Sequence, residues 1–283
     1  MTAYIDGRVH PPVAALLDGP LAPFLPGLEG VGTVPQAPLE PDEVAEFFRS
    51  RDARAVLLGW DSEATTNRRP FSNDDVAALV AGAPDVFIGF GAVDAAKGAA
   101  AVAQVHEAAR IGLSGLAMPP ATQHPGPADR ATELVWEAAA GHGLTCLFHT
   151  GVTRLGAGMP GGAGVRLSST NPLIIDKIAA RLPELRIVLA HTGRLWRAEA
   201  FAIAAHKPNV FLSLGGDELI GPDAADLREA VTGPLKEKIL FGSGYPFGDP
   251  DKWRADWSAL GLSDDVLQKV LYDNAAGLLG IES

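Results

Sequence analysis

The heptapeptide Tyr4-Ile5-Asp6-Gly7-Arg8-Val9-His10 begins as an apolar segment and ends in two large polar side chains. Side chains in an extended segment alternate between two faces, so Arg8 and His10 leave the end of a strand on the same side. One strand can present two groups to one site in this way. A metal site on such a strand would have His-x-His. Here the first position is arginine, whose guanidinium has no free lone pair with which to ligate a metal.

Eight apolar segments of strand length recur along the chain, each followed by an amphipathic, Ala-rich segment. The apolar segments are Ala3–Asp6, Ala55–Trp60, Val86–Val93, Leu113–Met118, Thr145–His149, Ile187–His191, Val210–Leu214 and Ile239–Ser243. Most are apolar at nearly every position, as expected of parallel strands buried on both faces. The alternation predicts an α/β fold, a (β/α)8 TIM barrel formed by residues 1–283 as one domain. A doubly wound open sheet is the alternative, but it usually has fewer strands, and no Gly-x-Gly-x-x-Gly follows the first one.

The amphipathic segments predict the helices of the barrel. They are Val44–Ser50, Val76–Val80, Ala99–Arg110, Asp129–Ala140, residues 171–180, Arg197–Ala205, Ala225–Val231 and Val266–Leu279. Two other segments are too long or too rich in glycine to be simple connections. Pro11–Pro41 is rich in Pro, Gly and Leu and is expected to form an N-terminal flap over the barrel mouth. Thr150–Thr170, after the fifth strand, lacks the Gly-Lys-Ser/Thr ending of a phosphate loop, so we expect a mobile lid.

The composition narrows the class of protein. Charged residues make up 20% of the 283 residues and hydrophobic residues 47%, which is normal for a soluble globular protein. No apolar run approaches the roughly 20 residues needed to span a bilayer, and no secretory signal is evident. The net charge of −11 argues against nonspecific nucleic-acid binding. With a single cysteine, Cys146, no intrachain disulfide can form, and we expect a cytoplasmic protein.

Three of the seven histidines fall at the C-terminal ends of predicted strands, where TIM barrels build their active sites. They are His10, His149 and His191, and the last two share the tripeptide His-Thr-Gly. Each alone could be a structural imidazole, but convergence of three on one barrel mouth favours function. The other four histidines lie on predicted helices or loops. Further candidates for substrate binding are Arg8, Trp60, Arg194 and Trp196, although tryptophan is more often a packing residue.

At these residues the sequence resembles the amidohydrolase superfamily, in the branch of aminocarboxymuconate-semialdehyde decarboxylase and related aromatic acid decarboxylases and hydrolases. The heptapeptide resembles the strand-1 Asp-x-His-x-His of that family, and the two His-Thr-Gly motifs, the second followed by Trp196, resemble its later histidine motifs. Residues 209–211, 240–243, 274–276 and 278–280 resemble other family motifs, so that the resemblance covers most of the chain.

The resemblance implies a divalent metal, commonly zinc. In the family the metal is held by both strand-1 histidines, the strand-5 histidine and a strand-8 aspartate, while the strand-6 histidine is the acid/base. This sequence keeps His10, His149 and His191 but has Arg8 and Gly244 at the other two ligand positions. It also has Ala117 where many relatives have a lysine. The metal-free lactonases of the superfamily show that the barrel tolerates loss of the metal.

Three hypotheses follow. The first is an enzyme that acts without a bound metal on a small anionic or carbonyl substrate, with Arg8, His10, His149 and His191 as catalytic residues. Its reaction would be decarboxylation, isomerisation or cyclisation, or opening of a lactone. The second is a zinc enzyme using His10, His149 and His191, which the nearby arginine opposes. The third is a catalytically inactive homologue that binds a ligand. No membrane or nucleic-acid partner is expected, and a homodimer is compatible with the resemblance.

Overall fold

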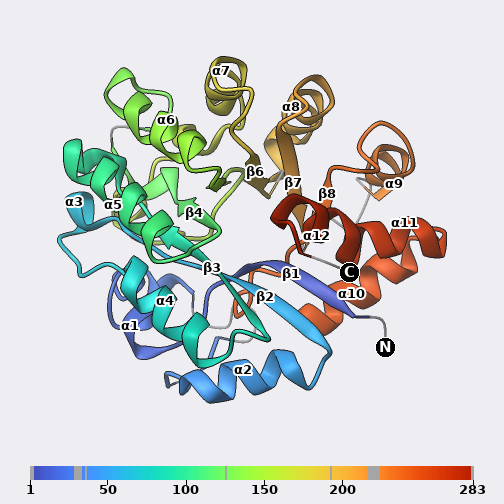
Figure 1. The fold of residues 1–283 in the computed structure, drawn as a ribbon, viewed down its shortest axis with the longest axis horizontal. Helices are drawn as coiled ribbons and strands as arrows, with labels where there is room; N and C mark the ends of the chain where they lie inside the picture. The colour runs from blue at the N-terminus through green and yellow to red at the C-terminus, as the bar shows by residue number, and fades with distance from the viewer. Residues whose placement is uncertain are drawn as a thin grey trace.

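The computed structural model describes residues 3–28, 34–35, 37–124, 126–191, 193–215 and 224–281, with the backbone alone for residues 193 and 194. Eight parallel strands follow one another in chain order in a single sheet, and helices surround it (Figure 1). The strands are β1 (Tyr4–Val9), β2 (Ala53–Leu58), β3 (Phe87–Ala92), β4 (Gly115–Met118), β5 (Thr145–His149), β6 (Ile187–Ala190), β7 (Val210–Leu214) and β8 (Ile239–Phe241). The predicted (β/α)8 barrel is confirmed.

The predicted helices are present around the sheet, although most of them begin a few residues before or after the predicted position. The longer ones are α2 (Pro41–Arg49), α4 (Asn73–Gly82), α5 (Ala99–Arg110), α6 (Glu133–Gly141), α7 (Leu173–Arg181), α8 (Gly193–His206), α9 (Ala224–Thr232) and α10 (Pro250–Ala259). Shorter ones are α1 (Ala14–Leu17), α3 (Glu63–Thr66), α11 (Asp264–Gln268) and α12 (Asn274–Leu279). No helix in the described part of the chain is long and apolar enough to cross a membrane.

The structure differs from the prediction at three elements. The helix α10 was not predicted, because it buries only Pro250 and Trp257 and its apolar face is therefore faint in the sequence. The last helix was predicted to be continuous over Val266–Leu279, but a π-helical turn at Lys269–Asp273 separates α11 from α12. The first strand also continues past Asp6, the predicted end, to Val9, so that Arg8 lies within the strand.

The first and last strands, β1 and β8, are joined by side-chain hydrogen bonds and lack a regular ladder of backbone hydrogen bonds. One isolated bridge joins Val9 to Tyr245. Asp6 is fully buried and accepts hydrogen bonds from the backbone N of Ser243 (2.8 Å) and from its Oγ (2.5 Å). A Cβ at Gly7 would lie 3.0 Å from the carbonyl oxygen of Phe241, a tight contact that favours glycine at this position. Asp6 and Gly7 thus join the first strand to the last.

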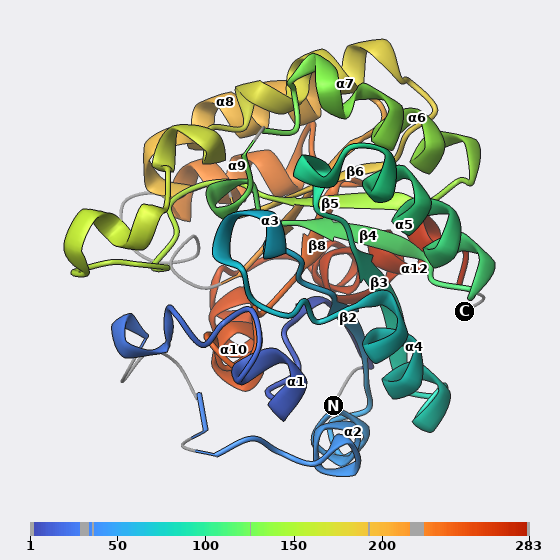
Figure 2. The same ribbon diagram turned by 90° about the vertical axis from the view of Figure 1, so that its left-hand side faces the viewer.

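The segments predicted as flap and lid contact each other. In the flap, α1 is followed by a 3-10 turn at Leu25–Gly27. Gly27 lies against the lid, since a Cβ there would be 3.1 Å from the carbonyl oxygen of Ala157 and 3.6 Å from Sδ of Met159. The lid is drawn together at its base, where the N–H of Gly151 donates to the carbonyl of Thr170 (2.8 Å). Figure 2 shows the lid, in yellow-green, projecting from the side of the barrel.

Candidate active site

The side chain of Arg8 lies at the centre of the candidate site. Only 1% of Arg8 is exposed. Its Nη2 donates to the carbonyl oxygen of Gly242 on the last strand's loop (2.7 Å). Its Nη1 is hydrogen-bonded to Nε2 of His191, at the end of the sixth strand. Because Arg8 has only donors, Nε2 of His191 is the acceptor in this bond and its proton lies on Nδ1.

The other two histidines form a pair beside Arg8. Their Nε2 atoms are 3.3 Å apart and their ring centroids 5.2 Å apart. His10 is held by its backbone N–H, which donates to the carbonyl of Tyr245 (2.8 Å). The ring of His149 is also 6.2 Å from that of His191. The structure therefore brings together all four residues that the sequence predicts as catalytic.

His191 is held in an unusual backbone conformation. Its φ is +64°, in the left-handed region that residues other than glycine rarely adopt. Its N–H donates to the carbonyl of Ser213 (3.2 Å), and its own carbonyl accepts from Oγ1 of Thr150 (2.8 Å). Thr150 is buried and belongs to the first His-Thr-Gly motif. The motif after the fifth strand thus supports the histidine after the sixth. Non-glycine residues in this region are enriched at functional sites.

Burial keeps the histidine pair neutral. Burial and, to a smaller extent, the positive charge of Arg8 together lower the pKa of His10 to about 3. Burial also holds the pKa of His149 well below its usual range, with smaller contributions from the neighbouring imidazoles and Arg8. Burial acts in the opposite sense on the Asp6 carboxyl, whose pKa rises to about 6 although the hydrogen bonds from Ser243 oppose the rise. At neutral pH the site therefore combines one fixed cation with two neutral imidazoles.

Aromatic rings form one wall of the site. The ring of Trp60 is 5.6 Å from that of His10 and 6.0 Å from that of His149. Its Nε1 donates to Oγ of Ser62 (3.2 Å), which is in turn bonded to Oγ1 of Thr122 (2.7 Å). These bonds tie the loop after the second strand to the loop after the fourth and fix the ring.

The structure separates the remaining candidates for substrate binding. Trp196 lies at a kink in α8, with φ −131° and ψ 26°. Among the described residues it makes no ring contact with the three histidines. The side chain of Arg194 lies outside the described residues. Trp60 is therefore the predicted tryptophan that lines the site.

One residue of the site was missed in the sequence, and a separate buried network lies next to Trp60. The ring of Phe247 lies 5.6 Å from that of His10, and no sequence motif marks Phe247 as a site residue. Asp61, next to Trp60, is fully buried, and its Oδ2 accepts from Nζ of Lys97 (2.6 Å) and Nε2 of Gln104 (2.7 Å). The sequence signal for this network is Asp61 directly after the second strand and Lys97 after the third, which form an ion pair.

The four remaining histidines are away from the site. His106 of α5 and His142, which directly follows α6, form a pair with Nδ1 of the first and Nε2 of the second 2.8 Å apart. Burial lowers the pKa of His124, in the loop after β4. His206 ends α8 and is exposed. None of them has a ring contact with His10, His149 or His191 among the described residues.

The residues present do not match the ligand set that the resemblance implies. Guanidinium donors of Arg8 occupy one ligand position, and Gly244 provides no side chain at another. Within the described ranges, no group of three or more His, Cys, Asp or Glu side chains is arranged to hold a metal ion. Two of the four metal ligands are thus replaced, one of them by a cation.

Comparisons with known proteins agree with this architecture. A sequence model of the family described as amidohydrolase matches residues 5–281. An uncharacterised TIM-barrel protein from Bordetella bronchiseptica is 25% identical, with 99% of each chain covered and a TM-score of 0.81. No curated protein sequence matches the chain significantly.

Two decarboxylases share the fold at lower identity. One is 5-carboxyvanillate decarboxylase from Sphingomonas paucimobilis, 18% identical, with 100% of each chain covered and a TM-score of 0.68. The other is dihydroxybenzoic acid decarboxylase from Polaromonas sp., solved with bound manganese and the inhibitor 2-nitroresorcinol. It is 15% identical, with 99% of this chain and 98% of that chain covered and a TM-score of 0.72.

Proposed function

The chain belongs to the amidohydrolase family, and we propose that it is an enzyme in which Arg8 replaces the charge of the metal. Its substrate would be a small anionic or carbonyl compound. The observation that carries the proposal is the position of the Arg8 guanidinium, buried between His191 and the carbonyl of Gly242. Decarboxylation is one reaction that fits, and two of the structural relatives are named as decarboxylases of aromatic acids.

A guanidinium can replace part of what a metal ion does. Its forked donors bind a carboxylate in a bidentate manner and stabilise a developing oxyanion. It does not lower the pKa of a bound water to near neutrality, as a metal does. Arg8 therefore suits decarboxylation, isomerisation or cyclisation, and opening of an activated lactone, none of which needs a metal-bound hydroxide.

The histidines would divide the remaining work. In the ligand-free arrangement Nε2 of His191 accepts from Arg8. An anionic substrate that takes over the Arg8 donors would release this lone pair, and His191 could then take or return a proton at Nε2. Both His10 and His149 have pKa values far below neutrality, so they would act as neutral hydrogen-bonding groups that orient the substrate against Trp60.

A zinc enzyme is the second candidate, and the histidine pair favours it. Two imidazole nitrogens 3.3 Å apart are close enough to bind one tetrahedral ion at about 2.0 to 2.1 Å each. Arg8 opposes it, because its positive charge lies against the same pair. The third candidate, an inactive homologue that binds a ligand, would keep the Arg8 site and lack turnover.

Metal analysis of protein purified without chelator tests the proposal first. We expect less than one tenth of an equivalent of zinc or manganese per chain. A thermal-shift screen with small aromatic and dicarboxylic acids follows, and the hits should lose their effect in Arg8→Gln but keep it in Arg69→Gln, an exposed arginine paired with Asp75. Near-stoichiometric metal would overturn the proposal in favour of the zinc enzyme. Ligands that bind through Arg8 but are returned unchanged would favour the inactive homologue.

A further inference from the structure

Two histidines outside the candidate active site meet on the outer surface of the barrel. His106 lies on α5, and His142 directly follows the neighbouring helix α6 (Figure 1). Both residues are exposed, and the two helices pack against each other. Nδ1 of His106 is 2.8 Å from Nε2 of His142, a hydrogen bond in which one ring donates and the other accepts. The proposed reaction uses neither residue.

The pair can offer two nitrogen ligands to one metal ion. A neutral imidazole has a proton on one ring nitrogen and a lone pair on the other. When His106 carries its proton on Nε2 and His142 carries its proton on Nδ1, both of the nitrogens that face each other present lone pairs. Reaching this state from the hydrogen-bonded pair moves one proton between the two nitrogens of one ring and changes no charge. Imidazole nitrogens are good ligands for copper, nickel and zinc ions.

The spacing of the two nitrogens indicates the coordination geometry. Two ligands at about 2.0 Å from one ion are about 2.8 Å apart at adjacent corners of a square plane and about 3.3 Å apart in a tetrahedron. The observed 2.8 Å matches the square plane, which copper(II) and nickel(II) prefer. The rings meet edge to face, with 81° between their planes. The broad χ2 minimum of histidine lets each ring tilt until its lone pair points at a shared ion.

The surroundings of the pair limit the site to these two protein ligands. The carboxylate next to His106, that of Glu107, accepts from Nε (2.9 Å) and Nη2 (2.5 Å) of Arg110. On the other side, Nη2 of Arg186 donates to the backbone carbonyl that directly follows His142. Water would therefore complete the coordination of the ion. A site with two protein ligands binds more weakly than the three- and four-ligand sites of catalytic and structural zinc.

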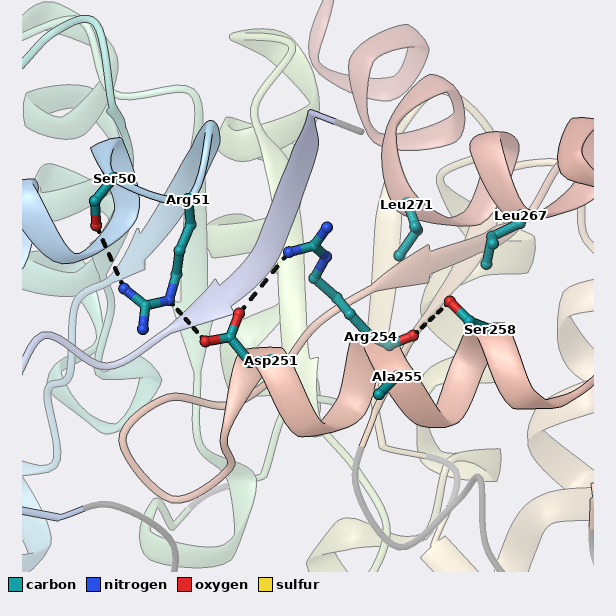
Figure 3. A pocket seen from close by; sticks show the side chains of 8 residues that line it. All are labelled: Ser50, Arg51, Asp251, Arg254, Ala255, Ser258, Leu267 and Leu271. Carbon is teal, nitrogen blue, oxygen red and sulfur yellow. Dashed lines mark hydrogen bonds and ion pairs between the residues drawn. The ribbon is translucent and has the colours of Figure 1, made fainter. Parts of the chain in front are cut away.

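Charged groups elsewhere on the surface suit such an ion less well. A groove of about 540 Å³ between α2 and α10 is an example. In it Asp251 forms ion pairs with both Arg51 and Arg254 (Figure 3). A carboxylate that lies between two cations is a poor ligand for a third, and carboxylate oxygens suit magnesium, calcium and manganese better than copper. We therefore expect copper to bind at the histidine pair in preference to this groove.

We propose that His106 and His142 form a surface site for one copper(II) ion. The ion binds Nδ1 of His106 and Nε2 of His142 at adjacent corners of a square plane, with water at the other corners. The site joins α5 to α6 and does not depend on the reaction proposed for the histidines at the barrel mouth. With two protein ligands the ion exchanges readily, so protein purified without added copper is not expected to retain it.

Isothermal titration calorimetry of the full chain, without an affinity tag, tests the proposal with copper(II) chloride at pH 7.5. We expect one equivalent to bind with a Kd of about 10 μM or tighter, because the second imidazole binds within the molecule once the first holds the ion. Binding should be at least about tenfold weaker in His106→Gln and in His142→Gln, and scarcely weaker still in the double variant, since either change alone breaks the chelate. Zinc should bind at least about tenfold more weakly than copper.

The matched control is His206→Gln. His206 is also an exposed histidine near a helix end, but its Nδ1 lies 3.0 Å from Nζ of Lys207, and it has no ring contact with another imidazole among the described residues. This variant should bind copper as the wild type does. Circular dichroism of each variant establishes that loss of binding is not loss of folding.

Electron spin-echo spectroscopy of the copper-loaded protein identifies the ligands. The wild type and His206→Gln should show modulation from two imidazoles, and each single variant of the pair should show one or none. The proposal fails if no binding is detected with 1 mM copper, or if zinc binds as tightly as copper. Binding that is unchanged in both His106→Gln and His142→Gln would place the ion elsewhere and overturn the proposal.

Discussion

Gly244 lies directly against the guanidinium of Arg8. A Cβ at position 244 would be 3.6 Å from Cζ of Arg8 and 3.7 Å from its Nη2, an ordinary van der Waals contact. The φ of Gly244 is +69°, a conformation that favours glycine. The two positions at which the sequence lacks a metal ligand of the resembling family therefore lie side by side. A side chain at 244 would meet the Arg8 side chain, so the two departures act on one site.

Restoring both ligand positions should restore a metal site. We expect Arg8→His combined with Gly244→Asp to bind about one equivalent of zinc, measured by plasma mass spectrometry after purification without chelator. The aspartate costs about 1 kcal/mol because of the positive φ. Arg8→His alone lacks the carboxylate, and Gly244→Asp alone places it against a cation, so each single variant should bind far less. A double variant without zinc would mean that the site has diverged beyond these positions.

Arg8 should contribute to the low pKa of His10. In Arg8→Gln the imidazole pKa should rise from about 3, because a like charge is removed. It should stay below 6.5, since burial is the larger cause and remains. Nitrogen-15 NMR of the histidine rings between pH 3 and 8 measures the change, with Arg69→Gln as the control. An unchanged His10 titration would show that the Arg8 charge does not act on the ring.

Asp6 should contribute more to the stability of the fold at acidic pH than at neutral pH. Its folded pKa of about 6 lies above its unfolded value of 3.8, so its favourable contribution is present below pH 4 and is lost as the pH rises through 6. Asp6→Asn does not titrate. The difference in unfolding free energy between wild type and Asp6→Asn should therefore move by about 2 kcal/mol in favour of the variant between pH 4 and 7. Urea unfolding at the two pH values measures it, and a difference independent of pH would contradict the prediction.

Gly242 should not tolerate alanine. A Cβ there would lie within clashing distance of Oγ of Ser213 and 3.2 Å from Cβ of Arg8. We expect Gly242→Ala to destabilise the protein by about 1 to 3 kcal/mol, and Ser213→Gly to rescue part of the loss. Gly277→Ala in α12 is the matched control, because its Cβ would meet nothing within 4 Å. It should stabilise by about 0.5 to 1 kcal/mol. If the two alanine variants shifted the urea midpoint equally, the neighbours of residue 242 would have moved to accommodate the added methyl group, contrary to the prediction.

The sequence predicts the barrel well because its strands are buried on both faces. Segments such as Ile187–Ala190 are apolar throughout, and all four of its residues are buried in the folded protein. The histidines were found for a related reason, since strand ends are local features whose common location follows from the fold. The contact of Arg8 with His191 was not predictable, because it joins residues 183 positions apart and depends on the register of all the strands between them. The helix α10 was missed because Trp257 is almost its only buried apolar residue.

The junction of β1 and β8 has a consequence for how the site arises during folding. Asp6 and Ser243 are 237 positions apart, so their bonds form only when the two ends of the chain come together. Contacts of such long range require a large loss of chain entropy and form late. The hydrogen bond between Arg8 and Gly242 can therefore form only after nearly the whole chain has been synthesised. A folding intermediate with only β1 to β7 in place would contain the three histidines. It would lack the contacts of Arg8 with Gly242 and Gly244, which follow the last strand.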